Sequence, residues 1–271
     1  MEITKREILV SIIIFFVLLS IGFLINNLII ENYILNVEEY NKALKVNNDS
    51  YLYKYSVDTE VGNILVYGDF KNENGVKFDE LSNDYAYIEK QTERYTRHSR
   101  RVCSNDSKGH QHCHTEYYYS WDEINREEKN INSIKFLGID YNYDIFNNYP
   151  KYRLELYSNV IESKKEYVKN NYLYKDKQGF WGASVGDIRY LYYYTPKEFM
   201  GTIFIKAKNK TIYNISLKGK ITIENTNLEK TLENKKNEGT TIAVIFWIIW
   251  LTIIGFAIYG YVYQDNYYLE D

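Results

Sequence analysis

Two long uncharged runs constrain this chain more than any other feature of its sequence. Residues 8–30 and residues 241–263 contain no Asp, Glu, Lys or Arg. A run of this length spans about 34 Å as a helix, enough to cross a hydrocarbon core about 30 Å thick. A buried core helix would usually be shorter and would keep one polar face. The sequence therefore predicts two transmembrane helices, with residues 31–240 between them.

The flanks of the first run predict how the chain is oriented. Lys5 and Arg6 precede the run, and positive residues favour the cytoplasmic side of a membrane. The run is longer than the apolar part of a cleaved signal peptide, so we expect an uncleaved signal anchor. Residues 1–7 and the tail 264–271 are then cytoplasmic, and residues 31–240 are extracytoplasmic or lumenal. The protein is expected in the plasma membrane or an endomembrane.

The segment between the runs has the pattern of short strands. Apolar and aromatic residues cluster or alternate between Gly, Asn and Lys turns, which is typical of antiparallel sheets. The expected strands are residues 63–70, 152–157, 186–194, 201–208, 211–217 and 220–224. The predicted fold class is a membrane protein with two transmembrane α-helices flanking a β-rich α+β domain, mostly antiparallel and extracytoplasmic.

Three further segments are read as helical. Residues 31–46 are expected to continue the first helix. Thr226 and Glu229 have the spacing of a capping box, which predicts a short charged helix before the second run. An acidic group follows Trp121, and acidic residues are favoured in the first turn of a helix, so we expect a helix to start there. The members of this group are Asp122, Glu123, Glu127 and Glu128.

Both cysteines and all four histidines lie between residues 98 and 114. The turn at residues 105–109 predicts a hairpin insertion near residues 92–121. A disulfide between Cys103 and Cys113 would close its tip and stabilise it by about 3 kcal/mol. An oxidising extracytoplasmic location makes such a bond chemically reasonable.

A metal site at the same tip is the competing interpretation. In a strand, alternate histidines share one face and can ligate zinc or copper. The residues with this spacing are His110, His112 and His114. The same alternation turns Cys113 to the opposite face, so a site with both residue types needs a loop. A tip with free thiols is the third interpretation.

No catalytic motif stands out. The chain has no glycine-rich phosphate loop, nucleophile elbow or zinc-protease motif, so no cofactor and no enzyme activity are predicted. A net charge of −3 gives no reason to expect nucleic-acid binding.

Several segments together resemble the LUMA-like transmembrane family, also known as the transmembrane protein forty-three family. They agree in order and spacing over residues 60–215, and they include a Gly-Asp-Ile-Arg strand ending at Arg189. The similar segments are residues 63–68, 88–95, 119–121, 171–194 and 196–211. The resemblance implies membrane organisation or scaffolding through self-association, with no enzyme chemistry, and the chain would be a bacterial or phage-encoded member. The chain departs from the family in having a single C-terminal span.

The sequence therefore favours a non-enzymatic integral membrane protein that organises membranes as a scaffold or binds protein partners through its extracytoplasmic domain. One alternative is a metal-binding or redox-responsive envelope protein that uses the Cys/His hairpin. Another is a viral or phage protein that modifies a host envelope. The expected partners are the lipid bilayer and other proteins, including further copies of the chain.

Overall fold

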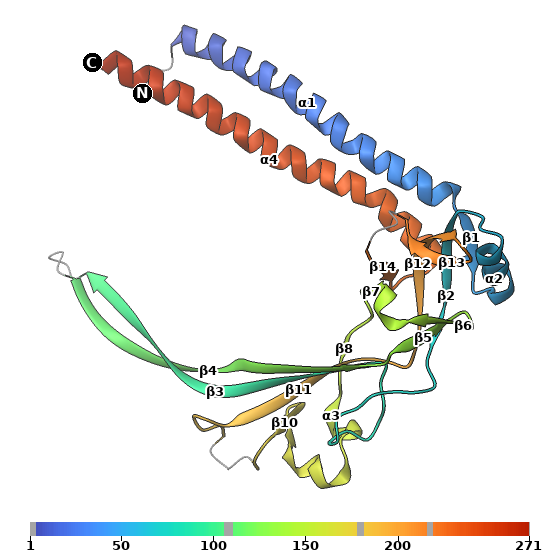
Figure 1. The fold of residues 1–271 in the computed structure, drawn as a ribbon. Coiled ribbons are helices and arrows are strands. Elements are labelled where there is room, and N and C mark those ends of the chain that lie inside the picture. The colour runs from blue at the N-terminus through green and yellow to red at the C-terminus, as the bar shows by residue number, and fades with distance from the viewer. Residues whose placement is uncertain (1–3, 106–110, 178–181, 216–218, 271) are drawn as a thin grey trace.

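The computed structural model describes residues 4–105, 111–177, 182–215 and 219–270. Two long helices, α1 (Lys5–Lys42) and α4 (Leu228–Glu270), form the first and last elements. All strands of the described residues lie between them, so the chain is a β-rich α+β protein (Figure 1).

Both predicted apolar runs fall inside these helices. Each helix is long and apolar enough to cross a membrane, and its most apolar window is almost entirely exposed. At 1.5 Å per residue, the 38 residues of α1 extend about 57 Å, well beyond a hydrocarbon core. The parts of α1 and α4 nearest the strands therefore extend beyond such a core.

The two helices lie side by side and antiparallel, with both chain ends at the far end of the pair (Figure 1). Midway along, the indole nitrogen of Trp250 donates a hydrogen bond of 3.0 Å to the carbonyl of Leu18. Trp250 fits there because the facing residue is Gly22, where a Cβ would overlap the indole ring. Arg6 and Asp265 form an ion pair of 2.6 Å near the chain ends. Contacts at the middle and the end therefore hold the pair together.

The helix boundaries differ in two places from the prediction. Helix α1 ends at Lys42, and residues 44–47 form strand β1. Helix α4 is continuous from Leu228, so there is no separate charged helix. The prediction of a capping box at Thr226 and Glu229 is wrong. The side chain of Asn227 caps α4 by accepting a hydrogen bond of 2.9 Å from the backbone N–H of Lys230.

The first sheet lies next to the helix pair and has the order β6-β5-β2-β12-β14-β7 among the described residues. Strands β1 and β13 pair with β2 and β12 outside this path. Its strands are β1 (Leu44–Asn47), β2 (Asn63–Lys71), β5 (Ser133–Phe136), β6 (Ile139–Asn142), β7 (Phe146–Asn147), β12 (Glu198–Lys208), β13 (Thr211–Asn214) and β14 (Ile221–Glu224). Most pairs are antiparallel, while β1–β2 and β14–β7 are parallel.

The second sheet has the order β4-β3-β11-β10-β9, with β8 beside β11. Its strands are β3 (Tyr87–Asn105), β4 (Gln111–Asn130), β8 (Tyr152–Arg153), β9 (Val168–Lys169), β10 (Tyr172–Tyr174) and β11 (Ile188–Thr195). Short helices complete the fold: α2 (Ser50–Asp58), α3 (Leu156–Asn159), and the 3-10 turns η1 (Tyr143–Ile145) and η2 (Glu162–Tyr167). Residues 152–157, predicted as one strand, are divided between β8 and α3.

Each sheet has its own hydrophobic core. The first core is centred on Phe70 of β2, which is fully buried and packs its ring against Phe136, Phe146 and Phe199. The second core lies beneath β3 and β11, where Ile88 and Tyr192 are fully buried. Strands β3 and β11 are thus anchored at their inner ends.

The predicted hairpin is present but longer than expected. Strands β3 and β4 pair from Tyr87↔Asn130 to Asn105↔Gln111. The acidic group from Asp122 to Glu128 lies in β4, so the predicted helix start there is wrong. The segment pairs with β3 from Asp122 opposite Arg94 to Glu128 opposite Glu89, so its backbone belongs to the antiparallel ladder of the hairpin.

We predict that Gly22→Leu separates the helix pair. A leucine there overlaps Trp250, so the indole loses its place against α1 and the pair loses affinity. Glycine-mediated close approach is a main source of helix association in lipid. A cysteine pair introduced at Arg6 and Asp265 should crosslink less than one-third as well in the Gly22→Leu background.

Gly255→Leu is the matched control, since nothing lies within 4 Å of a Cβ at that position. It should leave crosslinking unchanged. Equal loss in both variants would contradict the described packing.

Candidate functional site

The most distinctive feature of the described residues is the outer part of the β3–β4 hairpin. Strand β11 pairs with β3 only as far as Ile188↔Arg94. The backbone of Tyr95 then makes the last two bonds to this side, donating to Asp187 and accepting from Gly186 at 2.9 Å each. Beyond this point, residues 96–105 and 111–120 form a two-stranded ribbon that projects from the sheet (Figure 1). We call these residues the arm.

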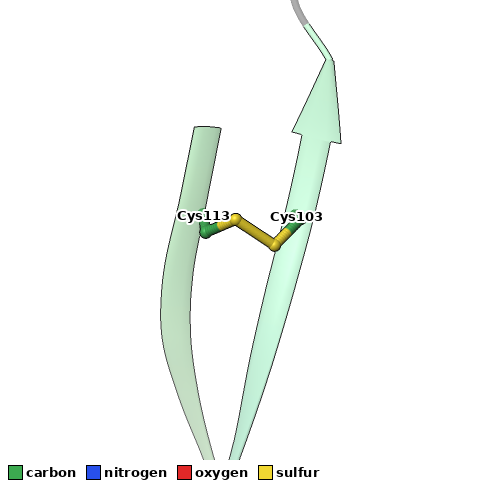
Figure 2. The surroundings of a disulfide bond; sticks show 2 residues. All are labelled: Cys103 and Cys113. Atoms are coloured by element: carbon green, nitrogen blue, oxygen red, sulfur yellow. A yellow bond between two sulfur atoms is a disulfide. The ribbon is translucent and has the colours of Figure 1, made fainter. Parts of the chain in front are cut away.

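The arm carries a covalent bridge near its tip. Cys103 and Cys113 lie directly opposite each other, with a Cα–Cα distance of 4.0 Å. Their sulfur atoms are 2.10 Å apart, at disulfide-bonding distance (Figure 2). The register of the hairpin therefore brings together the two cysteines that the sequence predicted as a pair.

The predicted metal ligands are not brought together in the same way. His110 lies outside the described residues. His112 and His114 lie in β4, where alternation places them on the face opposite Cys113. His114 Nε2 is 3.3 Å from a carboxylate oxygen of Glu116. Among the described residues, no three His, Cys, Asp or Glu side chains gather as metal ligands.

One face of the hairpin carries a row of aromatic and arginine side chains, which we call the aromatic face. Tyr95 of β3 packs against Tyr119 and Trp121 of β4, with ring centres 5.9 and 5.2 Å away. The guanidinium of Arg97 lies 4.8 Å from the ring centre of Tyr117. Tyr117 and Tyr119 are at least half exposed. The row therefore presents aromatic surface at the inner part of the arm.

Arg189 of β11 anchors the inner end of this row. Its guanidinium lies between two rings, 3.6 Å from the centre of Tyr172 and 4.2 Å from that of Trp121. Its Nε donates a hydrogen bond of 2.6 Å to the carboxylate of Glu93, and both side chains are about 85% buried. Stacking and ion pairing at low exposure suit arginine better than lysine. Arg189 thus links the arm to the second sheet.

The opposite face carries a polar network around Asp122. Hydrogen bonds from Thr96, and then from Ser120 and His98, hold the pKa of the Asp122 carboxyl below its usual range, although partial desolvation opposes them. The ring of His98 stacks on Tyr118 with a centre distance of 5.0 Å. Both hydroxyls point to the carboxylate and not to the imidazole. The network therefore orders side chains across the ribbon and does not form a nucleophile–base pair.

A buried carboxylate fixes the base of the hairpin. Glu89 is 3% exposed and accepts hydrogen bonds from Tyr87 at 2.7 Å and Lys151 at 3.0 Å. Burial raises its pKa, but hydrogen bonds from Tyr87 and Lys151 and the charge of Arg126 outweigh burial and lower it overall. The ionised carboxylate therefore joins β3 and β4 to the loop before β8.

A cavity of about 330 Å³ lies where the helix pair meets the first sheet. On one side Tyr40 of α1 packs on Phe204 of β12, with ring centres 3.9 Å apart. On the other side Lys235 of α4 lies 3.3 Å from Glu238 and 3.7 Å from Glu224. These contacts connect the helices to the sheet around an open space.

Comparison of the chain with models of protein families, with curated proteins and with solved structures found no match. The resemblance to the LUMA-like family therefore stays a prediction, and the site is interpreted from its own geometry.

Sequence reasoning missed the row of side chains that holds the arm. Tyr119, Trp121 and Arg189 entered the sequence analysis only as parts of segments that resemble the LUMA-like family. The available signal was the spacing of Tyr117, Tyr119 and Trp121, which share one face of a strand, matched by Tyr95 and Arg97 on the preceding strand. Arg189 gave no comparable signal because its partners come from three other strands.

We predict that Arg189→Ala weakens attachment of the arm by about 3 kcal/mol, because it leaves Glu93 with a largely buried and unpaired charge. Hydrogen exchange across residues 87–95 and 121–130 should become faster. Arg189→Lys should recover less than half of the loss, since lysine cannot stack between two rings.

Arg153→Ala is the control for this experiment. Arg153 of β8 is exposed, and its guanidinium lies 4.7 Å from the centre of the same Tyr172 ring. A similar loss in both variants would contradict the anchoring role of Arg189.

We further predict that replacing both cysteines by serine loosens the tip of the arm without unfolding the sheets. The closed loop is short, and its chain-entropy contribution is about 3 kcal/mol, or roughly a hundredfold in local opening. Hydrogen exchange at residues 99–105 and 111–117 should accelerate by about that factor. Unchanged exchange at the tip, or equal acceleration in β2 and β12, would show that the bridge does not act locally.

Proposed function

We propose that this chain is a membrane-anchored assembly protein with no enzyme activity. In this proposal α1 and α4 cross one bilayer together, the β-rich domain lies on the extracytoplasmic side, and the arm contacts other protein chains. The observation that carries the anchor is the exposed apolar exterior of the helix pair. Leu24, Ile248 and Phe256 are each more than 60% exposed, and apolar surface of this extent is suited to lipid.

The two ends of the helix pair support the orientation. Lys5 and Arg6 favour the cytoplasm, and the ion pair of Arg6 with Asp265 keeps the second chain end on the same side. The domain then lies in the compartment where a Cys103–Cys113 bridge forms and persists. Charge, helix pairing and cysteine pairing thus support one topology.

Membrane insertion sets a condition on the junction. In Figure 1 the arm and the helix pair extend toward the same side of the molecule. A bilayer around residues 8–30 and 241–263 leaves no room for an arm beside them. In this proposal the helix pair stands at a wider angle to the sheets in the membrane than in Figure 1.

The assembly role is supported by the form of the arm. A two-stranded ribbon is marginally stable alone in water, and this one exposes three consecutive tyrosines, Tyr117 to Tyr119. Tyrosine is enriched at protein interfaces because it combines apolar area with a hydroxyl. The arm therefore has the composition of a contact surface.

The experiment compares the full chain with a variant in which a Gly-Asn turn replaces residues 97–119. We expect both proteins to resist alkaline carbonate extraction from membranes. The full chain should migrate in larger complexes on native gels, and the armless variant should lose them. Carbonate release of the full chain would contradict the anchor, and retention of the complexes without the arm would contradict the assembly role.

A further inference from the structure

The outer edge of β4 is an open strand edge. Among the described residues, β4 pairs only with β3, so its other side runs along the border of the sheet. An unpaired edge is a template for another strand unless charges, prolines or bulges block it. Whether β4 is blocked therefore decides what this edge can do.

The inner half of β4 is blocked. Residues 122–130 include six charged side chains and no aromatic residue. The register with β3 shifts between Thr92 and Glu93, and the extra residue of this bulge is Ile124. Bulges and charges are the usual protection of edge strands. This half of β4 is therefore poorly suited to pairing.

The outer half of β4 lacks this protection. Residues 115–121 contain a single charge, no proline and no irregularity of register. Four of these seven residues are Tyr or Trp, which favour strands. Its backbone groups are also turned outward. The backbone N–H and C=O groups of Tyr95 form their hydrogen bonds on the side of β11. The pair Tyr95↔Trp121 therefore has no backbone hydrogen bonds across the hairpin, and the backbone groups of Trp121 point away from β3.

Because the direction of the backbone groups alternates along a strand, every second residue of β4 before Trp121 has the same direction as Trp121. The backbone N–H and C=O groups of Thr115, Tyr117 and Tyr119 point away from β3, as those of Trp121 do. The close Cα–Cα distance of 4.0 Å between Cys103 and Cys113 fits the same phase, since pairs without hydrogen bonds are the closer type. The open edge therefore presents a regular row of donors and acceptors.

We infer that the strand pairing with this edge is the same edge of a second copy, running antiparallel about a two-fold axis at Tyr118. This inference rests on the proposed function and names the partner of the arm. In this register Tyr117 lies opposite Tyr119 of the partner, twice by symmetry, and the three tyrosines align with themselves. Cross-strand aromatic pairs of this kind stabilise antiparallel sheets.

The polar residues on either side of the tyrosines are compatible with the same register. His114 lies opposite Asp122 of the second copy, and Glu116 lies opposite the neutral Ser120. A shift by one residue in the axis, to Tyr119, places Glu116 opposite Asp122, and like charges directly opposite are destabilising. A shift to Tyr117 places Glu116 opposite Tyr118 and replaces the tyrosine pairs by Thr115 opposite Tyr119. The axis at Tyr118 thus combines aromatic pairing with the absence of like charges directly opposite each other.

Cysteine crosslinking in native membranes tests this pairing on the full chain. Tyr118→Cys places its thiol opposite the same residue of the second copy, about 5 Å away between Cβ atoms. Glu116→Cys is the matched control on the same face, because its symmetry mate lies roughly 14 Å away. Mild oxidation should give at least tenfold more covalent dimer for Tyr118→Cys than for Glu116→Cys.

A second substitution tests the backbone bonds. Tyr119→Pro removes an outward N–H without removing a bond of the β3–β4 ladder, and proline is tolerated at such edge positions. Added to Tyr118→Cys, it should lower the dimer to the level of the Glu116→Cys control. Glu128→Pro, at an outward position of the blocked half, should leave the dimer unchanged.

Several results would overturn the pairing. They are equal crosslinking at positions 116 and 118, no dimer at either, or a dimer that survives Tyr119→Pro. Arm-dependent complexes that contain only other proteins would support the proposed function while refuting self-pairing. Carbonate release of the full chain would instead refute the proposed function itself.

Discussion

The antiparallel pairing of α1 and α4 determines where the chain between them starts and ends. These helices are the first and last elements, and their contacts at Trp250 and at Arg6 keep them together. The chain between them must therefore leave and return at one place. Strands β1 and β2 follow α1, while β12 and β14 precede α4, and these strands are neighbours in the first sheet. Closing the chain at both ends beside one sheet lowers the entropy cost of ordering its centre.

The second sheet extends from this base as a separate layer with its own core. Its longest strands continue well past the last contact with β11, so the arm depends on attachments at its two ends. Arg189 with Glu93 fixes the inner end, and Cys103 with Cys113 closes the tip. Between them, each face of the ribbon is ordered by cross-strand contacts alone. A ribbon built in this way has cross-strand contacts along its length and leaves one strand edge open.

Features that depend on neighbouring residues could be predicted from the sequence, whereas features that depend on distant residues could not. The two apolar runs and the strands near residues 63–70, 186–194 and 201–208 depend on local patterns, and the structure confirms elements there. The pairing of Cys103 with Cys113 also follows from one turn and its flanks. The acidic segment after Trp121 was misread as a helix because its strand partners, such as Lys90 and Arg94, lie 28 or more residues away.

The site was less predictable than the fold for the same reason. Arg189 acquires its role from Glu93, Trp121 and Tyr172, which come from three different strands. No spacing in the sequence indicates that these residues come together around Arg189. The open edge of β4 likewise depends on the order of the strands, and on β11 ending its pairing with β3 at Arg94. Sequence patterns indicate strands, whereas edges and anchors appear only when the strands are arranged.

In the proposed topology one bilayer surrounds the helix pair, with both chain ends on one side and the arm on the other. Labelling of intact cells with a membrane-impermeant maleimide distinguishes the two sides, using single added cysteines at Thr4, Gln264 and, in the arm, Ser99, so that Lys5 and Arg6 stay in place. Only the arm cysteine should be labelled before the membrane is opened, and all three should be labelled afterwards. Labelling of Thr4→Cys or Gln264→Cys in intact cells, or protection of the arm cysteine, would refute this topology.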